Sequence, residues 1–121
     1  MRRRRSYPED DIQRAVADHL RQRAVPGVVW WHTPNGGKRH PIVGAKLKDF
    51  GMRAGVSDII AVHNGRVFAL ELKAQNGVPS EPQMQFLSDI NAAGGSACIA
   101  AGVTQAVRVL EIWGLLRGVA A

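Results

Sequence analysis

Two acids and a lysine stand in an otherwise apolar stretch in the middle of the chain. The stretch is VSDIIAVHNGRVFALELK, residues 56–73, and its charged residues of interest are Asp58, Glu71 and Lys73. The Asn-Gly dipeptide between the two apolar runs predicts a β-hairpin with a two-residue type I′ turn. That turn sets a register in which Asp58 lies directly opposite Glu71 on one face. Side chains alternate along a strand, so Lys73 is expected on the same face as Glu71.

Two carboxylates that face each other on a partly buried surface repel, and they need a partner to offset the cost of burial. A proton between them would relieve the repulsion, or Lys73 could neutralise one of them in a structural salt bridge. A divalent cation could serve both, because carboxylate oxygens suit Mg²⁺ or Mn²⁺, and Mg²⁺ commonly takes only one or two carboxylates. The hairpin alone leaves both interpretations open.

Two further polar residues are predicted to face the interior from helices. Glu9 falls on the apolar face of a helix over 9–23, although a first-turn acid is also favoured there by the helix dipole. Gln83 falls on the apolar face of a helix over 80–93. Its alternative role is a capping box with Ser80 at the start of that helix.

The rest of the chain alternates between helical and extended patterns, which predicts a single α/β domain. Helices are predicted over 9–23, 42–52, 80–93 and 103–116, and strands over 28–33, the two arms of the hairpin and 96–102. A hairpin combined with helical crossovers implies a central mixed sheet of about four strands flanked by helices. At 121 residues the chain fits one domain, which we assign to residues 8–117 after a basic arm over 1–7.

The net charge of +6 and the grouping of the basic residues predict a nucleic-acid partner. One group is the arginine run at 2–5. The second group, with Asn35 in the loop PNGG, is expected to line a phosphate track that leads to Asp58. Its basic members are Lys38, Arg39, Lys46, Lys48 and Arg53. A solvated basic surface is the alternative.

Several classes of protein are excluded by composition. No apolar run approaches the roughly 20 residues that span a bilayer, and the N-terminal MRRRRSYPEDD lacks the apolar segment of a secretory signal. The single Cys98 excludes a disulfide within one chain. The histidines have no metal-ligand spacing and are assigned no role: His19, His32, His40 and His63. We therefore expect a cytoplasmic protein without a membrane partner.

The pattern Asp58, then Glu71-Leu72-Lys73 after a hairpin, resembles the PD-(D/E)xK nuclease signature, with Ser57 in place of its proline. The flanking segments extend this resemblance, in the order PEDDIQRAVADHLR, PNGGKR, GAKLKDFGMRAGVSDII and ALELKAQNGVPSEPQMQFLSDINAAGG. Together they resemble the virus-type replication-repair nuclease (VRR-NUC) domain, in its small stand-alone phage-like form. The resemblance covers nearly the whole chain, from about residue 6 to 116.

This resemblance implies a restriction-endonuclease-like core and hydrolysis of DNA phosphodiester bonds with Mg²⁺ or Mn²⁺. By position, the metal ligands would be Asp58, Glu71 and the backbone carbonyl of Leu72. Lys73 would orient or deprotonate the attacking water and stabilise the charged phosphate. A metal held in this way lowers the pKa of bound water and neutralises charge in the transition state.

The resemblance also implies that Glu9 holds a second metal or a metal-bound water, and that Gln83 is an auxiliary site residue. A chain this small has little surface for reading base edges, and phosphate contacts carry no sequence information. We therefore expect recognition of branched DNA, such as four-way junctions or flaps. The small stand-alone members resemble junction-resolving enzymes, which implies a homodimer.

Two other functions stay open at this point. One is a restriction, recombination or end-processing nuclease of the same fold. The other is a non-catalytic, basic DNA-binding module in which the acids form a structural salt bridge. Facing acids beside DNA would repel phosphate, which argues against the second alternative.

Overall fold

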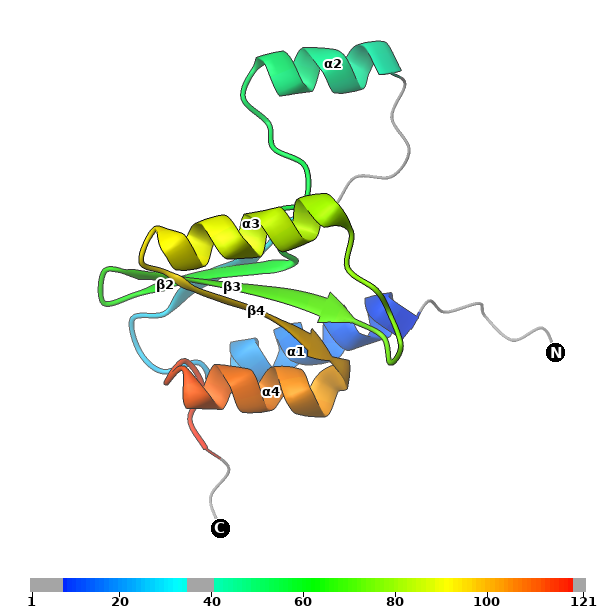
Figure 1. Ribbon diagram of the computed structural model, residues 1–121. Coiled ribbons are helices and arrows are strands. Elements are labelled where there is room, and N and C mark those ends of the chain that lie inside the picture. Colours follow the sequence, from blue (N-terminus) through cyan, green and yellow to red (C-terminus); the bar gives the residue numbers. More distant parts are fainter. Residues whose placement is uncertain (1–7, 35–40, 119–121) are drawn as a thin grey trace, which may run out of the picture.

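The computed structural model describes residues 8–34 and 41–118, so the predicted basic arm over 1–7 lies outside the described residues. Helices and strands follow the predicted order. They are α1 (Pro8–Arg23), β1 (Val29–His32), α2 (Pro41–Asp49), β2 (Ile59–His63), β3 (Arg66–Lys73), α3 (Glu81–Ala92), β4 (Ser96–Ala101) and α4 (Gly102–Ile112). Figure 1 shows their arrangement around the central strands.

The four strands form one mixed sheet in the order β1-β2-β3-β4. The neighbours β1 and β2, and β2 and β3, are antiparallel, whereas β4 runs parallel to β3. The hairpin accounts for the antiparallel pair at the centre, and α3 provides the crossover that a parallel neighbour requires. The predicted fold class, a mixed four-stranded sheet flanked by helices, is confirmed.

The β2–β3 hairpin has the predicted turn and the predicted register. Asn64 and Gly65 have φ angles of 51° and 75°, so both central residues occupy the left-handed region that a type I′ turn requires. The paired residues run from His63 opposite Arg66 to Ile59 opposite Leu70. Local turn chemistry therefore determines which side chains share a face at the far end of the hairpin.

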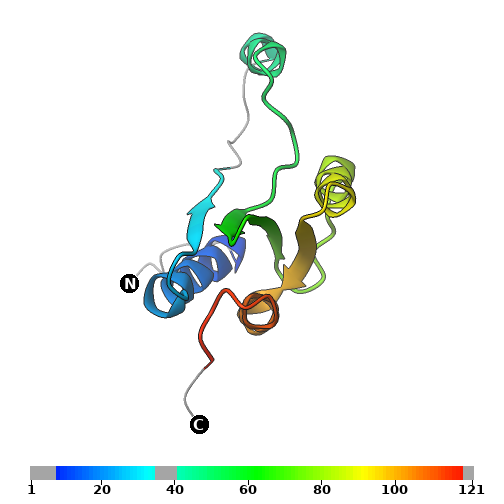
Figure 2. The same cartoon turned by 90° about the vertical axis from the view of Figure 1, so that its left-hand side faces the viewer.

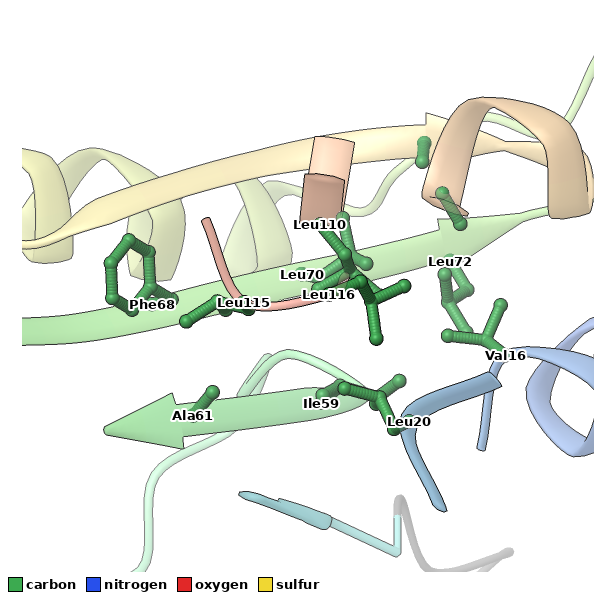
Figure 3. Close-up of a cluster of buried hydrophobic side chains, with 12 residues drawn as sticks. Val16, Leu20, Ile59, Ala61, Phe68, Leu70, Leu72, Leu110, Leu115 and Leu116 are labelled. Atoms are coloured by element: carbon green, nitrogen blue, oxygen red, sulfur yellow. The ribbon is translucent and has the colours of Figure 1, made fainter. Parts of the chain in front are cut away.

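Helices cover both faces of the sheet, α1 and α4 on one and α3 on the other (Figures 1 and 2). The larger core lies between the sheet and the first two of these helices, and Figure 3 shows its side chains. Residues with alternate positions in β2 and β3 supply its sheet side: Ile59, Ala61, Phe68, Leu70 and Leu72. A smaller core of Ile60, Ala69 and Phe86 lies on the α3 face, so Glu71, two residues after Ala69, belongs to that face.

Two helices are shorter than predicted, for one reason. The helix α2 ends at Asp49 and α4 at Ile112, rather than at 52 and 116. Gly51 and Gly114 follow with φ angles of 98° and 77°. In each case the amides of the glycine and of the next residue donate back to carbonyls of the last turn at 2.9–3.0 Å, which is the Schellman arrangement.

The helix α2 stands away from the rest of the molecule, beyond α3 (Figures 1 and 2). It makes no extensive packing with any other described helix or strand. Across residues 8–34 and 41–118, no helix is long and apolar enough to cross a membrane.

The segment that returns from α2 to β2 touches the first turn of α3 through Gly55. This glycine has a φ angle of 82°, and a Cβ there would lie 2.3 Å from the carbonyl carbon and oxygen of Pro82. The same Cβ would lie 2.6 Å from the backbone nitrogen of Gln83. A glycine at this position therefore lets two backbones meet next to the residues of the predicted site.

We expect Gly55→Ala to lower the free energy of unfolding by more than about 2 kcal/mol, because it combines backbone strain with a collision against backbone atoms. Gly51→Ala is the matched control, since its φ is 98° but its Cβ would meet no atom within 4 Å. We expect that control to cost about 1 kcal/mol. Urea denaturation followed by tryptophan fluorescence measures both, and equal losses would show that the close approach at residue 55 is unimportant.

Candidate active site

The carboxylates of Asp58 and Glu71 meet at the end of the central strands. There the tip of β3 lies beside the first turn of α1 (Figure 1). Both acids line a cavity of about 270 Å³. The other residues that line it come from α1, β1, β3 and α3: Glu9, Asp10, Gln13, His32, Leu72, Lys73 and Gln83. The structure thus brings all five predicted catalytic residues to one cavity.

Asp58, just before β2, is held by the strands on both sides. Its Oδ2 accepts a hydrogen bond from the backbone N–H of Leu72 in β3 at 2.7 Å. Its backbone carbonyl accepts from the N–H of Thr33 at 2.9 Å and lies 2.8 Å from Nδ1 of His32. The backbone pairing of β2 with β3 ends at Ile59 and Leu70. Beyond it, the Asp58 carboxylate accepts the hydrogen bond of the Leu72 N–H in place of a backbone carbonyl.

Glu71 is a buried acid, with 1% of its surface exposed. Its Oε2 accepts from Nε2 of Gln83 at 3.3 Å, and its carboxyl group is also hydrogen-bonded to that of Asp58. Its Oε1 is buried and has no hydrogen-bond partner among the described residues. One oxygen of this acid is therefore left without a donor from the part of the chain that the structure describes.

Burial raises the pKa of Glu71 from 4.5 to about 9, and the hydrogen bond and negative charge of Asp58 act in the same direction. The charge of Glu9 also raises this pKa, whereas the nearby ammonium of Lys73 lowers it. At neutral pH the carboxyl pair therefore retains a proton when no other cation is present. A protonated Glu71 carries no charge, which removes the repulsion that the hairpin register predicts.

Lys73 forms its ion pair with the acid of the first helix. Its Nζ lies 3.8 Å from Oε1 of Glu9, and the side chains are 12% and 53% exposed, respectively. Glu9 is in the first turn of α1, where the positive end of the helix dipole favours an acid. Glu9 therefore has the position that the helix dipole favours and also lines the cavity, where Asp10 is a further carboxylate.

Gln83 forms the capping box with Ser80 and also contacts Glu71 at the cavity. Its backbone N–H donates to Oγ of Ser80 at 3.3 Å, and its Oε1 accepts from the N–H of Ser80 at 2.8 Å, which completes the capping box. Its Nε2 is thereby directed at Glu71. The side-chain amide of Gln83 thus caps the start of α3 with its oxygen and holds the Glu71 carboxylate with its nitrogen.

The donor set fits a hard divalent cation. The N–H of Leu72 points to Asp58. In a strand, the N–H and C=O of one residue point to the same side, so the Leu72 carbonyl also lies on the side of Asp58. Two carboxylates and a carbonyl are oxygen ligands of the kind Mg²⁺ prefers, and the orphaned Oε1 of Glu71 is a position such an ion would satisfy. Among the described residues no three His, Cys, Asp or Glu side chains are grouped to hold a metal, so such an ion would rely on water and substrate for further ligands.

The predicted DNA-binding residues are not gathered at this cavity. Lys46 and Lys48 are exposed on the projecting α2, and Arg53 pairs with Asp89 of α3 and lies 5.1 Å from the centre of the Phe86 ring. None of these three basic residues lines the cavity. The predicted contacts Asn35, Lys38 and Arg39 lie outside the described residues.

Sequence reasoning assigned no site role to three polar residues of the cavity wall, Asp10, Gln13 and His32. Gln13 lies one turn after Glu9 on α1, so helical spacing could have found it, and its Oε1 is buried without a partner in the described residues. His32 ends β1, and no local pattern marked it, because only the pairing of β1 with β2 brings it to Asp58. Ser57, which replaces the proline of the signature, is fully buried, and nothing in the structure explains this choice.

No protein-family model matches the sequence, and no curated protein matches it. Several solved structures match the fold, and two of them are VRR_NUC domains. One, described as "VRR_NUC domain protein", superposes with a TM-score of 0.71 at 20% identity and covers 91% of this chain and 90% of its own. The other, described as "VRR_NUC domain", has a TM-score of 0.60 at 14% identity and covers 88% and 97%. The chain therefore has the fold of VRR_NUC domains, as the sequence resemblance predicted.

The proton held by Glu71 predicts how the stability of the metal-free protein depends on pH. Between its unfolded pKa of 4.5 and its folded pKa of about 9, Glu71 holds a proton that the unfolded chain has released. Stability should therefore fall as pH rises through this window. Glu71→Gln cannot lose a proton, so its stability relative to wild type should rise by more than about 1.4 kcal/mol between about pH 5 and pH 9, the energy of a pKa difference of 1.

Urea denaturation at a series of pH values, in the presence of a chelator, measures this difference. Glu81→Gln, which changes an exposed glutamate at the start of α3, is the control and should keep the pH dependence of the wild type. If Glu71→Gln also follows the wild type at every pH, the buried carboxyl does not hold a proton.

Proposed function

We propose that this protein is a VRR-NUC nuclease that hydrolyses phosphodiester bonds in DNA with the help of a divalent cation. The observation that carries the proposal is the pair of carboxylates at the cavity, where the buried Oε1 of Glu71, beside Asp58, has no hydrogen-bond partner within residues 8–34 and 41–118. Such a group costs stability, and proteins keep costly groups where function needs them. The likeness to solved VRR_NUC domains supports the reaction class.

The cation would be held by Asp58, Glu71 and the backbone carbonyl of Leu72. When bound, Mg²⁺ or Mn²⁺ would supply a Lewis acid for the phosphate and a lowered pKa for water. The raised pKa of Glu71 and its contact with Gln83 support a cation at this place. A cation would take the place of the proton on the carboxyl pair, and the Gln83 amide would keep Glu71 in position.

Lys73 provides a positive charge at the site. Its side chain is 12% exposed, so it is partly removed from water, where its electrostatic effect on a phosphate is stronger. It stabilises negative charge that develops on the phosphate and orients the attacking water. Glu9 holds this ammonium over the cavity, since the ion pair limits where Nζ can move.

We propose branched DNA, such as four-way junctions or flaps, as the substrate. The net charge of +6 favours phosphate, and the cavity and the lysines of α2 are separate points of contact for a long polyanion. Contacts of this kind read the shape of DNA rather than its sequence. A restriction or end-processing nuclease of the same fold would differ by cutting linear duplex equally well.

We also propose that two copies act together, because a four-way junction offers two symmetry-related strands. In the turn that follows α2, Phe50 and Met52 are 69% and 49% exposed, which is apolar surface that a second copy would cover. Sedimentation equilibrium should give twice the chain mass of 13.1 kDa. A mass of one chain, alone and on junction DNA, would contradict the homodimer.

Cleavage of labelled four-way junction, flap and linear duplex DNA, with Mg²⁺, Mn²⁺ or a chelator, tests the activity. We expect branched DNA to be cut only with a divalent cation, and Asp58→Asn and Lys73→Met each to lower the rate at least about 100-fold. Asp18→Asn and Arg21→Met make the same charge changes on the outer face of α1 and should retain activity.

Each outcome of this assay decides between the alternatives. Equal rates for wild type and the two site variants would overturn the assignment of the site. Binding of DNA without cleavage under either cation would favour the non-catalytic DNA-binding module. Cleavage of linear duplex as fast as the junction would favour a restriction or end-processing role.

The lysines of α2 should contribute to affinity rather than to the chemical step. We expect the double variant Lys46→Ala/Lys48→Ala to weaken DNA binding for every substrate and to reduce the slope of log Kd against log salt by about 1 to 2. The double variant Arg14→Ala/Arg21→Ala removes the same charge from α1 and is the control. Fluorescence anisotropy at several salt concentrations measures the slopes, and equal slopes for both double variants would exclude α2 from the DNA contact.

A further inference from the structure

His32 is a polar residue of the cavity that the proposed mechanism does not use. It ends β1 at the edge of the sheet, and its backbone pairs with Ile59, the residue after Asp58. Its ring Nδ1 lies 2.8 Å from the backbone oxygen of Asp58, and its side chain lines the cavity. The ring thus joins the edge strand to an acid of the proposed metal site.

The hydrogen-bond partner determines which ring nitrogen carries a proton. A backbone carbonyl can only accept, so Nδ1 of His32 is the donor in this contact. Because Nδ1 is engaged, Nε2 is the polar atom of the ring that stays available, and it makes no hydrogen bond with a described residue. The ring is therefore oriented from one side by the protein backbone.

The same carbonyl accepts from the N–H of Thr33 at 2.9 Å, so two donors from the end of β1 converge on Asp58. On the other side, the carboxylate of Asp58 accepts from Leu72 in β3 at 2.7 Å. The backbone of Asp58 is thus fixed by one neighbouring strand and its side chain by the other. A change in the first set of contacts would alter where the carboxylate lies.

We propose that His32 is a positioning residue that sets the place of the Asp58 carboxylate through the Asp58 backbone carbonyl. This inference rests on the proposed function in one respect, that Asp58 ligates the cation. Groups that orient metal ligands commonly change metal affinity by about 10- to 100-fold when they are removed. The role assigned to His32 is therefore measurable without any cleavage of DNA.

The test compares His32→Leu and His32→Gln with His32→Asn. Leucine removes both ring nitrogens, and glutamine carries its amide one bond too far from the backbone. The amide nitrogen of asparagine can occupy the place of Nδ1 and donate to the same carbonyl. His63→Leu changes a histidine at the opposite end of β2 and serves as the control.

Two measurements are made on each variant. The first is Mn²⁺ affinity by isothermal titration calorimetry without DNA, and the second is hydrogen exchange of the Leu72 amide in the metal-free protein by NMR. We expect His32→Leu and His32→Gln to weaken Mn²⁺ binding at least about 10-fold and to speed exchange at Leu72. His32→Asn and His63→Leu should stay within about threefold of the wild type for both quantities.

If His32→Leu and His32→Gln match the wild type in both measurements, the positioning role is wrong. If His32→Asn loses as much as His32→Leu, the donor at Nδ1 is not the relevant group and the inference also fails. If the wild-type protein binds no Mn²⁺, the proposal of a metal-dependent nuclease is wrong. The exchange rate of the Leu72 amide in the variants then tests the role of His32 by itself.

Discussion

The buried carboxyl pair of Glu71 and Asp58 is the constraint on which the site depends. An ionised acid that is almost fully removed from water is unstable unless a proton, a cation or several donors compensate for its charge. The described residues provide the Gln83 amide and the Asp58 carboxyl, and they leave one oxygen of Glu71 without a hydrogen-bond partner. The surrounding apolar strands provide the rigidity that keeps this costly arrangement in place.

Several elements of the fold meet at this pair, and each contributes a different kind of restraint. The hairpin places the acids at the end where its register stops, one residue beyond the pair Ile59 and Leu70, and the close approach at Gly55 brings the first turn of α3 to the same place. That turn directs Gln83 at Glu71 while its other amide atom caps the helix. The start of α1 adds Glu9, which holds the ammonium of Lys73. The local contacts that begin the helices therefore also build the site.

Much of this could be predicted from the sequence, because short-range chemistry decides it. The Asn-Gly turn determines the register of the hairpin without reference to the rest of the fold, and the Ser80 to Gln83 spacing determines the capping box. The ends of α2 and α4 were predicted too late, since apolar periodicity continues past the glycines where the Schellman hydrogen bonds close the helices.

The sequence by itself thus determined the α/β class, the order of the elements and the placement of Asp58, Glu71 and Lys73 at one end of a hairpin. Only the tertiary structure decided which groups surround them. The pairing of β1 with β2 brings His32 to the Asp58 carbonyl, the packing of α1 brings Gln13 to the cavity, and α2 carries its lysines away from it. The physical reason is that turns and caps depend on a few neighbouring residues, whereas burial, and with it the raised pKa of Glu71, depends on contacts between distant parts of the chain.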